Sequence, residues 1–197
     1  MQILEIKKLS LKGTILDVGS KESLTNVTNY LKTQEKIIYA NKHSKNPKDL
    51  NIDLEKTSDF GEIKFNNVLL FNVLEHIFNY KNCLKNCYTI LRKDGFFCGS
   101  TPFFFRIHSS PNDYFRYTEQ SILKLLKETG FSELKIKVLD GGIFICFFSS
   151  ISTLTNKIPL FNNLLLIICN VLDFINSLFA KNIKSSFPLG YFFQGKK

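Results

Sequence analysis

Short apolar runs alternate with helically periodic segments over residues 14–139 of the chain. The runs are rich in Val, Ile, Leu and Phe and are bounded by Gly, Asn or Lys, as buried parallel strands are; they cover 14–18, 36–40, 67–72 and 95–101. A weaker candidate strand surrounds Asp53, and residues 133–139 alternate like a half-exposed strand. This alternation predicts an α/β fold built on a parallel sheet.

Two segments between the expected strands have the periodicity of amphipathic helices. "YKNCLKNCYTILRK" (80–93) places Leu84, Cys87 and Leu91 on one helical face. "TEQSILKLLKETG" begins with a Thr cap and ends at Gly130. We therefore expect a helix over each segment, packed on the sheet.

The pattern changes after Gly142. Residues 143–180 carry only Lys157 and Asp173 as charges, but the longest uncharged run is about 16 residues, short of the ~20 that span a membrane. Asn and Asp recur on one side of the segment, which suits an amphipathic helix at a membrane interface. A helical subdomain folded onto the core, or a self-association face, explains the pattern equally well.

The chain thus divides into three parts. We expect an α/β core over 1–142, an apolar helical insertion over 143–186, and a last strand with a basic tail over 187–197. A length of 197 residues suits one globular unit with additions.

The charge composition limits the classes of partner that we expect the protein to bind. The net charge is +9, but only three of the 26 basic residues are Arg, and the lysines are spread along the chain. Because Arg is the preferred residue for phosphate and base recognition, nucleic-acid binding is disfavoured. An anionic membrane surface stays open as a partner.

The five cysteines form an odd set without a CxxC pair. Cys83 and Cys87 lie one helical turn apart, but no matching His or Cys pair completes a zinc-binding pattern, so we expect reduced thiols and no metal. The segment "MQILEIKKLS" has no apolar stretch typical of secretion signals. We therefore expect a cytoplasmic protein, either free or peripheral at the inner face of the membrane.

The end of the first predicted strand offers an incomplete nucleotide-binding loop. "ILDVGSKES" (15–23) contains an acidic residue and one glycine, whereas a dinucleotide fingerprint requires GxGxxG. Asn41 follows the second strand, where dehydrogenases usually have a carboxylate for the ribose. A dinucleotide-dependent dehydrogenase is therefore disfavoured.

Five segments in order carry a family resemblance: "ILDVGS", "NVLLFNVLEHI", "YTILRKDGFFCGSTP", "HSSPNDYFRYT" and "LLKETGF". Over about residues 13–140 the chain resembles class I S-adenosylmethionine-dependent methyltransferases of the broad small-molecule group. The resemblance implies a Rossmann-like, doubly wound, mostly parallel sheet of seven strands. Its last strand would be antiparallel and lie in "PLGYFF", beside apolar C-terminal helices.

The resemblance also implies a function. The cofactor would be S-adenosyl-L-methionine, and the acceptor a small molecule, a glycan or a lipid-linked compound. The alternative is a catalytically inactive methyltransferase-like scaffold that acts as a binding or membrane-associated accessory protein. It is motivated by a first loop with one glycine, in which Ser20 to Ser23 replace the others, and by the missing charge at Asn41.

The cofactor-binding residues follow from the family's motifs. The first loop would admit the methionine part, the second strand end would contact the ribose, the third would contact the adenine, and the fourth would lie near the methyl donor. These positions are Asp17, Gly19 and Ser20, then Asn41, then Asp53, then Asn72 and Val73. Asp17 as a loop-organising acceptor, and Asn41 as a turn residue, are the structural alternatives.

The acceptor side is predicted after the fifth strand. His108 is the candidate catalytic base, because an imidazole titrates near neutrality. The candidate substrate-binding residues are His76, Asp113, Tyr114 and Arg116. Alternatively, Asp113 and Arg116 form an ion pair that fixes the loop with Tyr114 packed beneath it, and His76 is a structural hydrogen bonder.

Overall fold

The computed structural model describes residues 2–20, 26–42, 46–56, 62–109 and 111–197. Within them lies one six-stranded sheet of order β2-β1-β3-β4-β6-β5. The strands are β1 (Ile15–Val18), β2 (Ile37–Ala40), β3 (Phe65–Phe71), β4 (Leu91–Pro102), β5 (Ser132–Gly141) and β6 (Pro188–Lys196). Neighbouring strands are parallel from β2 to β4, and β6 runs antiparallel to β4 and β5. The predicted doubly wound fold with an antiparallel last strand is confirmed.

The sheet has six strands in the described residues where seven were expected. The candidate strand around Asp53 contributes one isolated parallel bridge, between Ala40 and Leu50. Side chains here bond locally instead: Asn46 accepts from the Lys48 amide at 3.1 Å, and Asp53 accepts from the Glu55 amide at 3.1 Å. Such local bonds offer the backbone an alternative to a sheet ladder.

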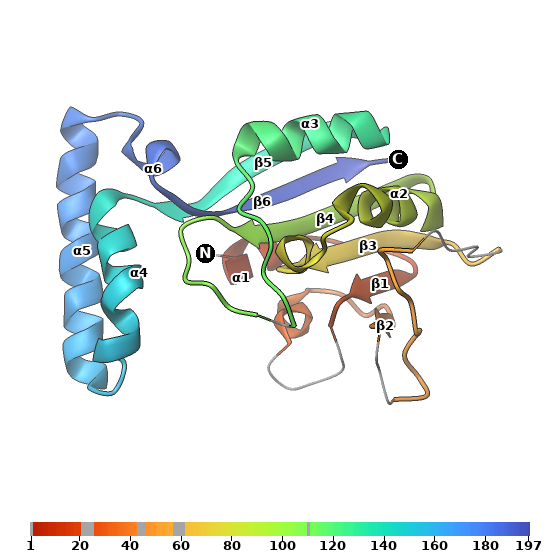
Figure 1. The fold of residues 1–197 in the computed structure, drawn as a ribbon, viewed down its shortest axis with the longest axis horizontal. Coiled ribbons are helices and arrows are strands. Elements are labelled where there is room, and N and C mark those ends of the chain that lie inside the picture. The colour runs from red at the N-terminus through yellow and green to blue at the C-terminus, as the bar shows by residue number, and fades with distance from the viewer. Residues whose placement is uncertain (1, 21–25, 43–45, 57–61, 110) are drawn as a thin grey trace.

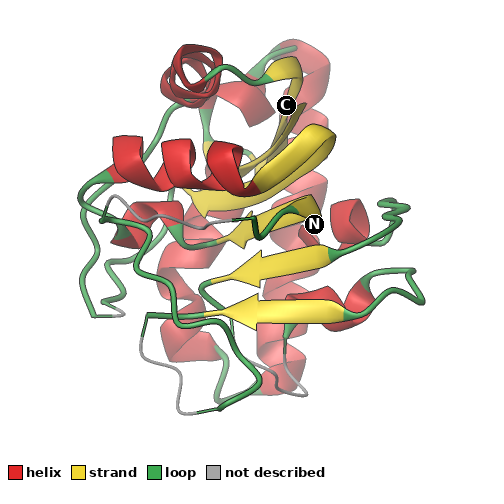
Figure 2. Ribbon diagram, turned by 90° about the vertical axis from the view of Figure 1, so that its right-hand side faces the viewer, coloured by secondary structure: helices red, strands yellow, loops and turns green. Residues whose placement is uncertain are grey.

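Helices cover both faces of the sheet (Figure 2). On one face lie α2 (Tyr80–Ile90), packed on β4, and α3 (Glu119–Thr129), packed on β5 and β6; Leu84 and Ile122 belong to the core beneath them. On the other lie α1 (Gln2–Ile6) and the 3-10 turn η1 (Val27–Tyr30). The expected cap of α3 is present, because Thr118 accepts from the Ser121 amide and Gly130 adopts a left-handed φ of 108°.

Helix α2 is shorter than predicted. It ends at Ile90, and Leu91, expected on its apolar face, instead begins β4 and pairs with Phe65 of β3. All five cysteines are free and buried, and Cys83 and Cys87 lie in α2 facing the core.

A helical hairpin stands apart from the sheet, beyond the carboxyl ends of the parallel strands (Figure 1). It consists of α4 (Ile143–Thr155) and α5 (Pro159–Phe179), and the short α6 (Ile183–Ser186) leads back to β6. Asp173 of α5 is buried and joins the two helices, because its carboxylate accepts from the amides of Phe144 at 3.1 Å and Ile145 at 2.7 Å. It thereby caps the first turn of α4.

Candidate active site

A cavity of about 560 Å³ lies at the carboxyl ends of the first three strands. The sheet order reverses at this point, since β1 has β2 on one side and β3 on the other. Such a switch point opens a crevice in which α/β proteins bind ligands. Seven of the predicted site residues line the cavity: Gly19, Asn41, Asp53, Asn72, Val73, His76 and Tyr114.

Gly19 closes the end of β1 against the turn after β3. Its φ of 83° is left-handed, and a Cβ at this position would lie 2.4 Å from Cγ2 of Val73. Its amide donates to the carbonyl of Ala40 at 2.7 Å. A glycine is therefore required here by both backbone conformation and space. The predicted replacement of glycines at 21–23 lies outside the described residues.

Asp17 lies beneath this loop. Its side chain is buried and accepts from Thr28 Oγ1 at 3.2 Å and Asn26 Nδ2 at 3.4 Å, whereas Oδ1 has no hydrogen-bond partner among the described residues. Burial raises the pKa of Asp17 to about 7, against the opposing hydrogen bonds from Ser20, Thr28 and Asn26. Neither Asp17 nor Ser20 lines the cavity, so their geometry fits a role in organising the loop.

The opposite wall of the cavity carries an ion pair. Lys42 Nζ lies 3.0 Å from Asp53 Oδ2 and 3.9 Å from Glu55 Oε2. Burial tends to raise the pKa of Asp53, but hydrogen bonds from Lys42 and the Glu55 amide outweigh it and lower the pKa. Asp53 is therefore an anion, available as a hydrogen-bond acceptor at the cavity wall. Asn41 lies beside it, its amide bonded to the carbonyl of Leu50.

Asn72 connects the turn after β3 to its surroundings. It has a left-handed φ of 53°, which Asn tolerates better than most residues. Its Oδ1 accepts from Ser100 Oγ at 2.9 Å, and its Nδ2 donates to Gln2 Oε1 at 3.3 Å. The N-terminal helix α1 is thus attached to the floor of the site.

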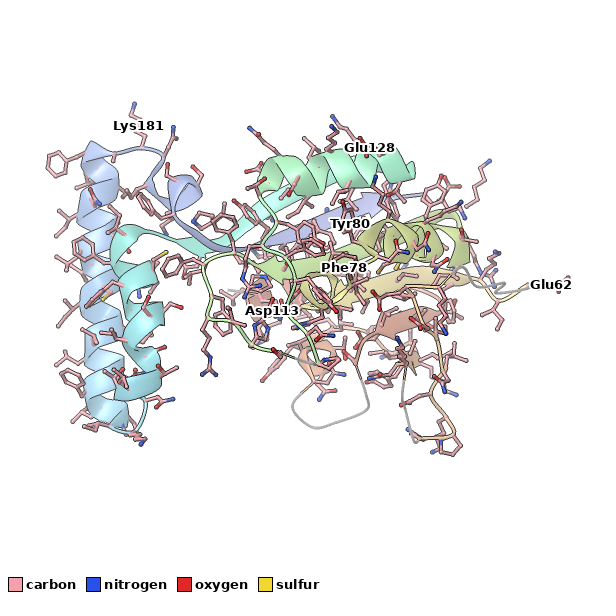
Figure 3. All side chains as sticks on the ribbon, viewed as in Figure 1. Glu62, Phe78, Tyr80, Asp113, Glu128 and Lys181 are labelled. Carbon is pink, nitrogen blue, oxygen red and sulfur yellow. The ribbon has the colours of Figure 1, made fainter. Side chains whose placement is uncertain are left out.

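The loop after β4 is fixed by the predicted Asp113–Arg116 ion pair. The guanidinium donates to Asp113 Oδ2 at 2.7 Å and to the carbonyls of Phe115 at 2.9 Å and Arg106 at 3.2 Å. The hydrogen bond from Arg116 holds the pKa of Asp113 well below its usual range. Asp113 also accepts from the His108 amide at 2.9 Å. Figure 3 places Asp113 on the loop between the sheet and the helical hairpin.

Tyr114 does not pack beneath this ion pair. Its ring contacts Phe78 edge-on, with centroids 5.2 Å apart, and its amide donates to the carbonyl of Glu75 at 2.8 Å. It thereby joins the loop to the 3-10 turn η2 (Leu74–His76) and lines the 560 Å³ cavity.

Two further cavities flank the loop. One of about 580 Å³ lies between the loop and α4, and Asp113, Tyr114 and Arg116 line it together with Phe103 and Ser149. The other, of about 280 Å³, is lined by Asn72, Thr101 and His108. The predicted substrate-binding residues therefore divide between cavities: His76 lies on the cleft, Tyr114 borders both it and the 580 Å³ cavity, and the catalytic candidate His108 lies in the 280 Å³ cavity.

Glu75 is a site residue that sequence reasoning did not single out. Its side chain is fully buried; Oε2 accepts from Thr101 Oγ1 at 3.4 Å, and Oε1 has no hydrogen-bond partner within the described ranges. Burial raises its pKa to about 7. The Nε2 atoms of His76 and His108 lie 3.7 and 3.9 Å from Oε1. The available signal was an acidic residue next to His in "NVLEHI", at a strand end.

Part of the chain matches a known family model. Residues 15–99 match the family model described as a methyltransferase domain. A search of curated protein sequences finds no match to the chain.

Solved structures of several methyltransferases share the fold. Haemonchus contortus phosphoethanolamine N-methyltransferase 2, in complex with S-adenosyl-L-methionine, is 14% identical, with 100% of this chain and 52% of that chain covered and a TM-score of 0.60. An S-adenosylmethionine-dependent methyltransferase from Archaeoglobus fulgidus is 14% identical, with 99% and 89% covered and a TM-score of 0.56.

One structural neighbour is named for another reaction. The [4+2]-cyclase SpnF is 11% identical, with 99% of this chain and 78% of that chain covered and a TM-score of 0.58. The chain spans about half the length of the phosphoethanolamine methyltransferase. The predicted resemblance is confirmed: residues 15–99 match the methyltransferase-domain model, and the chain has the fold of S-adenosylmethionine-dependent methyltransferases.

Proposed function

We propose that the protein transfers the methyl group of S-adenosyl-L-methionine to a small-molecule or lipid-linked acceptor at a membrane surface. The carrying observation is the 560 Å³ cavity at the switch point, lined by Gly19, Asn41, Asp53, Asn72 and Val73. These are five of the seven residues that the family's motifs assign to the cofactor. Structural neighbours support the assignment, because three of them were solved with S-adenosylmethionine or S-adenosylhomocysteine.

The roles of the cleft residues follow from their chemistry. Asp53 would accept a hydrogen bond from the adenine amino group, Asn41 would bond a ribose hydroxyl, and the backbone at Gly19 would admit the methionine part. Methyl transfer is an in-line displacement, so the protein mainly holds the acceptor against the methyl group. The sulfur would therefore face Asn72 and Val73, on the side toward His76 and His108.

The acceptor would enter from the side of the helical hairpin. The 580 Å³ cavity there has a largely apolar wall that includes Phe103 and Phe105, with Ser149 and Thr153 of α4 opposite. Apolar walls with few polar groups suit an acceptor that has an apolar part. The neighbour from Burkholderia thailandensis, solved with 1,6-didemethyltoxoflavin, acts on a small molecule.

Helix α5 supports the membrane part of the proposal, because some of its polar side chains face α4 while its large apolar side chains face outward. Asp173 caps α4, and Asn162 accepts from Thr155 Oγ1 at 2.7 Å, so these polar groups lie at the joint between the helices. The opposite side exposes large apolar side chains, including Ile167, Phe174 and Leu178. Figure 3 shows side chains of α5 projecting away from the rest of the molecule. An exposed apolar face of this length requires a partner.

Among the described residues, α5 is the one helix that is long and apolar enough to cross a membrane. In its most apolar stretch of 18 residues, 11% is buried. It is longer than the uncharged run because it continues through Asp173. We favour an interfacial position on the cytoplasmic side, because Asp173 and the neighbouring amides hold α5 against α4. Lys157 and Lys181 flank the helix and would contact anionic headgroups.

Calorimetric titration with S-adenosylmethionine and S-adenosylhomocysteine tests the enzyme proposal. We expect the wild type to bind both, Asp53→Ala to weaken binding, and His108→Ala to spare it while reducing turnover. Glu128→Ala is the control, since it removes an exposed carboxylate of α3 that is distant from the cleft (Figure 3). Absence of heat and of any thermal shift at millimolar cofactor would favour the inactive accessory scaffold.

Flotation with vesicles of phosphatidylcholine and phosphatidylglycerol tests the membrane proposal. The wild type should float, and Phe174→Glu, in the exposed apolar face, should not. Asn170→Glu is the matched control, because it adds the same charge at an exposed polar position of α5. If all three proteins stay with the soluble fraction and sediment as a dimer that Phe174→Glu dissociates, the face serves self-association instead.

A further inference from the structure

Three metal-ligand side chains meet at the junction of the cavities. Glu75 and His76 come from η2, and His108 comes from the loop after β4. One donor atom from each lies within 4.8 Å of the other two. The rings of His76 and His108 contact edge-on, with centroids 4.9 Å apart.

The outer nitrogen of each ring has its own partner. His76 Nδ1 bonds the carbonyl of Asn112, and His108 Nδ1 lies 3.3 Å from Asp113 Oδ2. These contacts favour the proton on Nδ1 and leave the Nε2 lone pairs directed to the side of Glu75 Oε1. Metal-bound histidines are oriented in the same way, by a carbonyl or carboxylate at the other nitrogen.

The carboxylate at the centre lacks a partner that a cation would supply. Glu75 Oε1 is buried and accepts no hydrogen bond from the residues that the structure describes, and buried polar atoms in native proteins are rarely left without a partner. Arg116 is not the missing partner, because its guanidinium bonds Asp113 and the carbonyls of Phe115 and Arg106. Thr101 Oγ1 occupies the other oxygen, Oε2.

We propose that Glu75 Oε1, His76 Nε2 and His108 Nε2 bind a divalent transition-metal ion of the Zn²⁺ type. Donor atoms on one such ion are about 3.0–3.4 Å apart at bond lengths of about 2.0–2.2 Å. The separations of 3.7 and 3.9 Å therefore need to close by about half an ångström, and the two imidazole donor atoms, which lie within 4.8 Å of each other, need to move closer as well. Two imidazoles with one carboxylate suit Zn²⁺ or Fe²⁺, whereas Mg²⁺ and Ca²⁺ prefer oxygen donors.

The ion would lie between two cavities, where its open coordination positions could bind a substrate. His76 lines the 560 Å³ cavity and His108 lines the 280 Å³ cavity, with Glu75 between them. An acceptor hydroxyl bound to the ion would lose its proton to solvent. Its oxygen would attack the methyl carbon, with the C–O bond forming as the C–S bond breaks and S-adenosylhomocysteine leaving. This role, unlike metal binding itself, rests on the proposed function and selects acceptors with an oxygen nucleophile.

Titration of chelator-treated protein with Co²⁺ tests the site without any turnover. We expect one Co²⁺ per chain, with visible d–d bands and no thiolate charge-transfer band, and displacement by Zn²⁺. His108→Ala and Glu75→Gln should each lower the affinity at least about tenfold. His108→Ala is the safer variant for folding, because its side chain is 32% exposed, and melting curves check both.

The matched control is Asp53→Asn, which removes a carboxylate from the same cleft. It should bind Co²⁺ like the wild type and bind S-adenosylmethionine more weakly, whereas His108→Ala should do the reverse. The proposal is overturned if the wild type binds no Co²⁺, if folded His108→Ala and Glu75→Gln bind it unchanged, or if thiolate bands assign it to cysteines. Cobalt binding without cofactor binding would retain the metal site and reject the methyltransferase activity.

Discussion

The buried carboxylate of Asp17 predicts that the stability of the fold depends on pH. Its pKa is about 7 in the folded protein and 3.8 in its ordinary state, because burial disfavours the anion. Between these values the folded state binds a proton that the unfolded state has lost. The free energy of unfolding should therefore be highest near pH 4, fall as pH rises to about 7, and then level off.

The magnitude follows from the shift. One pKa unit corresponds to about 1.4 kcal/mol, so a shift of about 3 units amounts to ~4 kcal/mol. Asp17→Asn keeps the shape and cannot ionise, so it should lack this contribution. Its stability relative to the wild type should rise by up to ~4 kcal/mol from pH 4 to pH 7.

Urea denaturation of the wild type and Asp17→Asn at pH 4, 5, 6, 7 and 8 measures the effect. The result to compare is the difference in free energy of unfolding between the two proteins at each pH. The buried Glu75 also titrates, but it does so in both proteins, so its contribution cancels from this difference. A difference that stays constant from pH 4 to pH 8 would refute the reasoning. It would mean that the hydrogen bonds from Ser20, Thr28 and Asn26 stabilise the anion fully.

Three other changes have defined outcomes. Gly19→Ala should lower the free energy of unfolding by about 1–3 kcal/mol, because Gly19 has a left-handed φ and an added Cβ would clash with Val73. The second substitution Val73→Ala should restore part of this loss. Urea denaturation that shows no loss for Gly19→Ala would contradict this reasoning. Asp173→Ala should cost about 0.5–2 kcal/mol by uncapping α4, and proteolysis within 143–186 should accelerate; an unchanged cleavage rate would argue against the cap. Arg116→Lys should speed hydrogen exchange over 103–117, because Lys lacks the fork that holds Asp113 and two carbonyls together; equal exchange in both proteins would show that the loop does not need the fork.

The sequence predicted the class of fold because its strands are buried on both faces. Residues 68–71 of β3, for example, form a continuous apolar run, which can be recognised without knowledge of the rest of the chain. The boundary of α2 was wrong at Leu91, because an apolar residue fits either a helix face or a buried strand. The missing strand near Asp53 reflects side-chain bonds that a hydropathy pattern does not contain.

The sequence predicted those residues of the candidate site whose positions are determined by the ends of the parallel strands. The order of the strands brings Gly19, Asn41, Asp53 and Asn72 to one edge, as expected from a doubly wound sheet. That Asp17 would lie behind the cavity wall depends on its rotamer and on η1. The Glu75–His108 approach depends on the path of a Pro-interrupted loop, and no spacing rule encodes it.

The helical hairpin leaves the sheet and returns to it at the same point. Gly141 and Pro188 are register partners of β5 and β6, and the Gly142 amide donates to the Phe187 carbonyl at 2.9 Å. Because the two ends already lie side by side, an insertion of any length between them adds little closure entropy and leaves the strand register intact. The hairpin is thus an exchangeable module: a short turn, or a hairpin with another outer face, could take its place while the same core keeps its cleft.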